Sequence, residues 1–159
     1  MLNTFRMFSL MKGSRAEVTE KQGYTVKAIL DSGVHSAKPD INALATIAKW
    51  EADVMVWNYH DDNNPAVGAA PVHIEVKGIP AATATLRQYR IDNEHSNAYE
   101  VWKKMGSPVS PTIMQKDTLR KAEQLQTISP RKQITITNGH ATINVELPSH
   151  GVSLFQLDW

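Results

Sequence analysis

The chain has 159 residues, 42% of them hydrophobic, which suits one domain with a substantial core. Its 17 Lys and Arg residues nearly balance its 16 Asp and Glu residues, and no basic block recurs, so neither nucleic acid nor an anionic membrane surface is indicated as a partner. No apolar run reaches the roughly 20 residues of a membrane span, and the lack of cysteine excludes disulfides and thiolate sites and leans towards a reducing, cytoplasmic compartment.

Residues 1–12 are predicted to form a helix that ends at Gly13, a residue suited to a left-handed C-terminal position. Arg6 interrupts the apolar residues and no small-residue cleavage site follows, which argues against a secretory signal. Apolar side chains occupy more than one side of this helix, so it needs a covering surface. The side chains that most need this cover are Leu2, Phe5, Phe8 and Met11.

Residues 13–159 are predicted to form a mainly β domain, an antiparallel β-sandwich, because eight or nine short strands alternate with turn signals. The clearest hairpin joins residues 41–47 to 52–59, and the Asn138-Gly139 pair predicts a tight hairpin between residues 133–137 and 141–147. The remaining predicted strands are 15–19, 24–30, 71–77, 83–91 and 152–159.

A two-helix insertion is predicted at about residues 95–128. After Ile91 the apolar period changes from alternation to a helical spacing, with Ala98, Val101, Trp102 and Met105 on one side. We expect this side to dock on the sandwich. The first helix ends at Gly106, and the second begins at a capping box formed by Thr112 and Gln115.

The polar residues before this insertion allow two interpretations. Carboxylates near a histidine, here around Asp92 and His95, can be tuned for acid/base chemistry, which would make this stretch part of a distinct enzyme. We favour a structural role, because Asp92 and Ser96 stand where side-chain oxygens cap free amides at a helix start. The residues predicted to fix this strand-to-helix joint are Asp92, His95, Ser96, Asn97 and Trp102.

No metal or cofactor site is expected. Four consecutive residues from Asp61 to Asn64 offer oxygens suited to calcium, but they cannot all surround one ion, so a turn is the expectation. The six histidines show no helical pairing suited to zinc. Among the aromatic residues, Trp57 and Trp102 lie in apolar patterns and are expected in the core, whereas Trp50 is expected to be exposed.

Five motifs in constant order carry a resemblance to a known family. They are Leu2-Asn3 with Phe5-Arg6-Met7, Val56-Trp57-Asn58-Tyr59-His60-Asp61-Asp62, Tyr89-Arg90-Ile91-Asp92 with His95-Ser96-Asn97, Trp102 with Met105-Gly106-Ser107-Pro108, and Leu147-Pro148 with Gly151-Val152-Ser153-Leu154. From its first residues to its last, the chain resembles the C-terminal part of glycoside hydrolase family 39 β-xylosidases.

The resemblance implies a (β/α)8 barrel followed by a β-sandwich, with two barrel glutamates hydrolysing xylosides with retention. Residues 1–12 would match the last barrel helix and residues 13–159 the sandwich. The family's acid/base follows an asparagine and precedes a proline, whereas Asn93-Glu94 is followed by His95, so no residue here inherits a catalytic role.

We therefore expect a non-catalytic accessory domain that supports the missing barrel, shapes the rim of its active site and assists assembly of a homo-oligomer. Without the barrel, the apolar side chains of the first helix would form an exposed patch or a contact between chains. The alternative is a self-standing carbohydrate-binding module that binds xylo-oligosaccharide through exposed aromatic residues such as Trp50.

Overall fold

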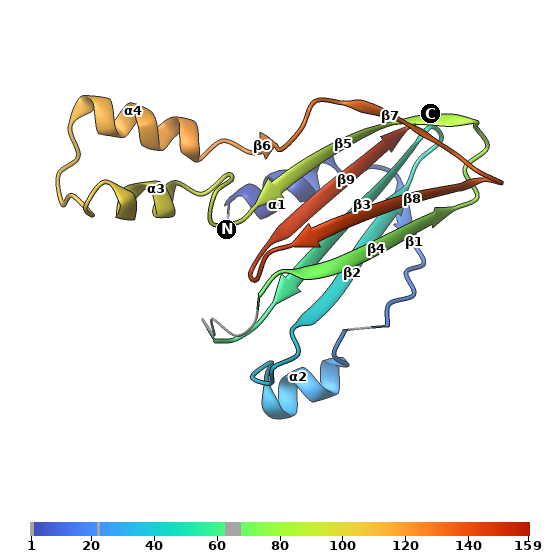
Figure 1. Ribbon diagram of the computed structural model, residues 1–159, viewed down its shortest axis with the longest axis horizontal. Helices are drawn as coiled ribbons and strands as arrows, with labels where there is room; N and C mark the ends of the chain where they lie inside the picture. The colour runs from blue at the N-terminus through green and yellow to red at the C-terminus, as the bar shows by residue number, and fades with distance from the viewer. Residues whose placement is uncertain (1, 22, 63–67) are drawn as a thin grey trace.

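The computed structural model describes residues 2–21, 23–62 and 68–159. Figure 1 shows two antiparallel sheets packed face to face, a helix on the outer side of the larger sheet, and two helices that project from one end. No helix in the described ranges has the length and apolar character that crossing a membrane requires. The helices are α1 (Leu2–Leu10), α2 (Val26–Ser32), α3 (Ala98–Lys104) and α4 (Ile113–Ala122).

The larger sheet has seven strands in the order β1-β2-β3-β9-β5-β6, with β7 also paired to β5. The smaller sheet consists of β4 and β8. All pairs are antiparallel, in agreement with the predicted sandwich. The strand bounds are β1 (Ser14–Ala16), β2 (Asp40–Ile47), β3 (Glu51–Tyr59), β4 (Ala70–Lys77), β5 (Thr83–Ile91), β6 (Gln126–Thr127), β7 (Lys132–Thr135), β8 (His140–Leu147) and β9 (Val152–Asp158).

The main core lies between the two sheets. Successive side chains of a strand point to opposite faces, so Val56, Leu86 and Phe155 of the larger sheet meet Ile143 and Leu147 of the smaller one. Phe155 and Leu147 are fully buried. The opposite set of side chains on β3, β5 and β9 therefore forms the outer face of the larger sheet, where α1 lies.

The strand predicted over residues 24–30 is wrong, because this segment contains α2. Thr25 caps the helix by accepting a hydrogen bond from the Ala28 amide, and Gly33 ends it with φ 65°. Val26 and Leu30 are 73% and 80% exposed, so the alternating apolar residues do not mark a buried strand face. Local capping decides the conformation here.

The turn at Asn138-Gly139 forms as predicted, but the hairpin does not. Both residues have positive φ, 54° and 77°, and a single bridge joins Thr137 to His140. Beyond this bridge β7 pairs with β5 and β8 pairs with β4, so the chain passes from one sheet to the other. A two-residue turn reverses the chain locally without deciding which strand each arm joins.

Candidate functional site

Helix α1 packs one side onto the outer face of the larger sheet. Met7 is completely buried there against Met55 of β3 and Leu154 of β9. The half-buried residues around this cluster are Leu10, Met11, Leu44, Tyr89, Ile91, Leu125 and Val152. Burial of this side fixes α1 as a second layer on the sandwich.

The opposite side of α1 is apolar and exposed. Leu2, Phe5 and Phe8 are spaced three residues apart, which places them along one stretch of helix surface, and they are 61%, 64% and 44% exposed. We call these three residues the α1 face. Met11, the fourth residue predicted for this surface, is half-buried and packs against the Met7 cluster instead.

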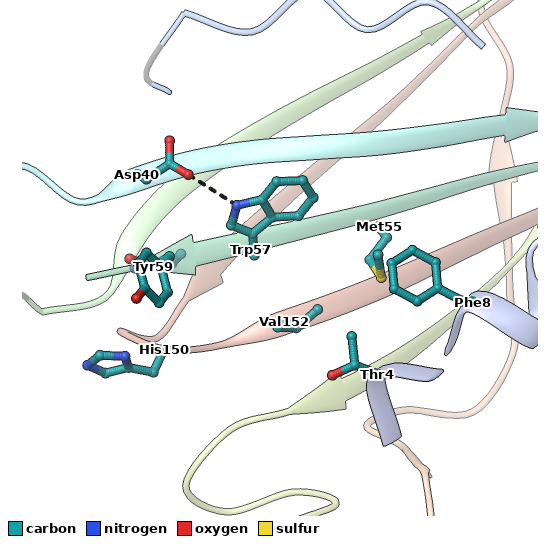
Figure 2. A pocket seen from close by; sticks show the side chains of 9 residues that line it. Thr4, Phe8, Asp40, Met55, Trp57, Tyr59, His150 and Val152 are labelled. Carbon is teal, nitrogen blue, oxygen red and sulfur yellow. Dashed lines mark hydrogen bonds between the residues drawn. The ribbon is translucent and has the colours of Figure 1, made fainter. Parts of the chain in front are cut away.

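A hollow of about 490 Å³ adjoins the α1 face (Figure 2). Its lining residues come from α1, from β2 and β3, from the turn before β9 and from β9 itself: Thr4, Phe8, Asp40, Met55, Trp57, Asn58, Tyr59, His150 and Val152. The Trp57 indole N–H donates to Asp40 Oδ2 at 3.2 Å, and Asp40 Oδ1 accepts from the Tyr24 amide at 2.7 Å. These bonds hold the indole on the outer face, so the core position predicted for Trp57 is wrong.

Asp92 organises the loop between β5 and α3. Its Oδ1 accepts hydrogen bonds from the amides of Glu94 and His95, both at 2.8 Å, and contacts His95 Nδ1 at 2.9 Å, while its Oδ2 lies 3.6 Å from Arg90 Nη1. Burial by itself would raise the pKa of Asp92, but the hydrogen bonds from Glu94 and His95 outweigh it and lower the pKa. This carboxylate is engaged in holding the loop.

Arg90 is the buried cation that pairs with Asp92. Its Nε donates to Ser153 Oγ at 2.7 Å, which ties β5 to β9. Burial lowers the pKa of the Arg90 guanidinium, and the Asp92 charge opposes that effect. The two side chains are 8% and 6% exposed, so the ion pair is almost fully buried.

The cap of α3 differs from the prediction. Asn97, not Asp92 or Ser96, is the N-cap, and its side chain accepts from the Glu100 amide at 3.3 Å. Ser96 has φ 57° and sits between strands: its hydroxyl donates to the Arg90 carbonyl at 2.7 Å and accepts from the Gln126 amide at 2.9 Å. The polar residues before α3 thus connect the two ends of the insertion.

Trp102 lies within the helical pair instead of docking on the sandwich. Its ring stacks on Tyr99 at 5.7 Å between centroids, and its Nε1 donates to the Pro108 carbonyl at 3.1 Å. Helix α3 packs against α4, and Figure 1 shows both helices extending beyond the sheets. The core position predicted for Trp102 is therefore wrong, since α3 has no buried residue and its apolar side is only half-buried.

An acidic cluster that the sequence did not reveal fastens the other end of α1. Asp53, 1% exposed, accepts from the Lys12 amide at 2.9 Å and from Gln156 Nε2 at 3.0 Å, and Lys12 Nζ pairs with Glu51 at 2.7 Å. Burial raises the pKa of Asp53. The sequence signal for this cluster was the pair of acids, Glu51 and Asp53, at the start of an apolar strand. Their partner Gln156 could not be inferred, because it lies 103 residues from Asp53 in the chain.

No group of three or more His, Cys, Asp or Glu side chains suited to a metal occurs in residues 2–21, 23–62 and 68–159. Of the calcium-type oxygens considered above, Asn63 and Asn64 fall outside the described residues. Asp62 contacts His35 Nδ1 at 2.8 Å, and Asp61 accepts from Tyr59 Oη at 2.6 Å. These acids are used in local contacts.

These features define an antiparallel β-sandwich with a helix fastened over one sheet and a projecting helical pair. The family described as "Glycosyl hydrolases family 39" matches residues 1–140. The chain belongs to this family.

Two curated relatives are similar to this chain over about 100 residues each. The α-L-iduronidase of Canis lupus familiaris is 28% identical over 99 residues, covering 62% of this chain and 15% of the relative. The α-L-iduronidase of Mus musculus is 26% identical over 102 residues, covering 64% and 16%. The chain thus spans about one sixth of the length of these relatives.

Solved structures show the same fold. A monomeric β-xylosidase from Caulobacter crescentus matches with a TM-score of 0.74 and 13% identity, over 98% of this chain and 30% of that one. A family 39 enzyme from Xanthomonas axonopodis pv. citri matches with a TM-score of 0.64 and 20% identity, over 77% and 28%. The fold described above is therefore shared with a part of larger glycosidases.

Proposed function

We propose that this chain is a non-catalytic accessory domain of a family 39 glycosidase and that the α1 face docks on a (β/α)8 barrel. The observation that supports this proposal most is that α1 is apolar on two opposite sides. Met7 is buried against the sheet, whereas Leu2, Phe5 and Phe8 are exposed on the opposite side. Exposed apolar patches of this kind mark protein contacts. Hydrogen bonds hold the helix near both ends, from Asn3 Nδ2 to the Ser96 carbonyl and from the Lys12 amide to Asp53, which suits a surface prepared for docking.

The proposal is supported by the small share of the similar glycosidase structures that this chain covers. The chain accounts for less than a third of the β-xylosidase and family 39 structures that share its fold. The whole protein would then hydrolyse xylosides with retention, and the sandwich would support its barrel and help to shape the rim of its active site. The projecting helices would also offer a surface for assembly of a homo-oligomer.

A carbohydrate-binding module is the second candidate, because Trp50 is 59% exposed. Its ring is already approached by Lys49 Nζ at 5.1 Å from the centroid, so a cation occupies one face that a sugar would need for stacking. This contact favours the accessory role over sugar binding at Trp50.

One preparation of the chain tests both functions. The accessory role predicts no hydrolysis of an aryl β-xyloside at any pH and no change in tryptophan fluorescence on titration with xylo-oligosaccharides. Hydrolysis that survives purification and disappears in a Glu94→Gln variant would overturn the non-catalytic role. Saturable quenching that disappears in a Trp50→Ala variant would establish the binding module instead.

A further inference from the structure

Both ends of the helical insertion meet one side chain of α1. Asn3 Nδ2 donates to the carbonyl of Ser96, just before α3, at 2.7 Å and to the carbonyl of Glu123, the C-cap of α4, at 3.0 Å. Asn3 is 7% exposed and Ser96 is 6% exposed, so the first of these bonds is shielded from water. One amide group thus joins segments that are 93 and 120 residues away in the chain.

Arg6 completes this contact from the next turn of α1. Its Nη1 donates to Asn3 Oδ1 at 2.8 Å and to the Glu123 carbonyl at 2.7 Å. Carbonyls at the end of a helix lack partners within the helix, and a cation there is favoured by the helix dipole. Arg6 therefore orients the Asn3 amide and stabilises the end of α4 at the same time. We call Asn3 and Arg6 the α1 clamp.

The direction of the helical insertion matters because the insertion exposes several large apolar side chains. We call α3, α4 and the residues between them the helical arm, and Figure 1 shows it extending beyond the sheets. The large apolar side chains that the arm exposes are Tyr99, Val109, Ile113 and Met114, which are 61%, 100%, 80% and 81% exposed. A small rotation of the arm about its two ends would move these side chains relative to the α1 face.

We propose that the α1 clamp sets the direction of the helical arm, so that a barrel docked on the α1 face meets the arm's exposed apolar side chains at a fixed place. Asn3 and Arg6 are positioning residues in this scheme. The identity of the partner rests on the proposed function, whereas the coupling between α1 and the arm rests on the contacts of this chain alone. The two ideas can therefore fail separately.

The lack of native cysteine allows a distance measurement on the intact chain. Spin labels would be attached to Lys116→Cys, near the start of α4, and Thr142→Cys on β8, two exposed positions, and the distances measured by pulsed electron paramagnetic resonance. The otherwise unchanged chain is expected to give one narrow distance peak. In the Asn3→Ala variant this peak should be replaced by a broad distribution.

Two further variants keep the test decisive. Arg6→Ala removes only the hydrogen bonds to Asn3 Oδ1 and to the Glu123 carbonyl, and the second of these bonds is exposed. The variant should therefore still fold, and its distance peak should broaden. Ser9→Ala removes an exposed hydrogen bond within α1 and should leave the peak unchanged. A narrow, unshifted peak in Arg6→Ala, with the circular dichroism spectrum retained, would overturn the proposal whatever barrel binding shows.

Discussion

Replacing Arg90 with alanine is expected to lower the free energy of unfolding by about 3–5 kcal/mol, because it leaves a buried carboxylate without its ionic partner. Arg90 and Asp92 are both almost fully buried, and Arg90 also donates to Ser153 of the neighbouring strand. Urea unfolding followed by circular dichroism measures the loss. Arg120→Ala is the matched control, since its pair with Asp117 is exposed and should contribute no more than about 1 kcal/mol.

The pH dependence of the free energy of unfolding tests whether Asp92 contributes to stability as a charged carboxylate. The pKa of Asp92 is lower in the folded chain than its ordinary value, so its contribution is complete above the unfolded pKa of roughly 3.9 and is lost as the pH falls through the folded pKa. The difference in stability between the unmodified chain and Asp92→Asn should therefore shrink as the pH falls below about 4. A difference that stays constant with pH would assign the acid sensitivity to other carboxylates.

Met7→Ala is expected to destabilise the chain by about 2–5 kcal/mol, because Met7 is completely buried between α1 and the sheet and its truncation leaves a cavity. Phe5→Ala on the α1 face should change stability by no more than about 0.5 kcal/mol, since Phe5 is 64% exposed. Urea unfolding of the two variants measures the contrast. Equal losses would mean that Phe5 is covered in solution by another surface.

The sandwich was predictable because its strands carry strong local patterns. Alternation over residues 71–77 and 83–91 reappears as β4 and β5, and the predicted hairpin of residues 41–47 and 52–59 reappears as β2 and β3. These patterns report which face of a strand is buried. They do not report which strand lies next to it, and for this reason the arms of the Asn138-Gly139 turn were assigned to the same sheet.

The polar contacts that hold α1 were not predictable, because their partners are distant in the chain. Asn3 gives no sign in the sequence that it binds the carbonyls of Ser96 and Glu123. Asp92 was expected to cap α3 because acids are common at helix starts, yet it holds the preceding loop and Asn97 caps the helix. The residue types from Asp92 to Asn97 favoured a structural role for this loop. The hydrogen-bond partners of each side chain follow only from the three-dimensional arrangement.

The most direct test of the docking role is sedimentation velocity of this chain mixed with a folded family 39 barrel produced without its last helix and without its own sandwich. Docking through the α1 face predicts a faster-sedimenting complex, and the loss of this complex when Phe5 and Phe8 are both changed to aspartate. Glu75→Lys, on the outer face of the smaller sheet, is the control and should leave the complex intact. Failure of the unmodified chain to bind, or a complex that persists with both aspartates in a folded chain, would contradict docking through α1.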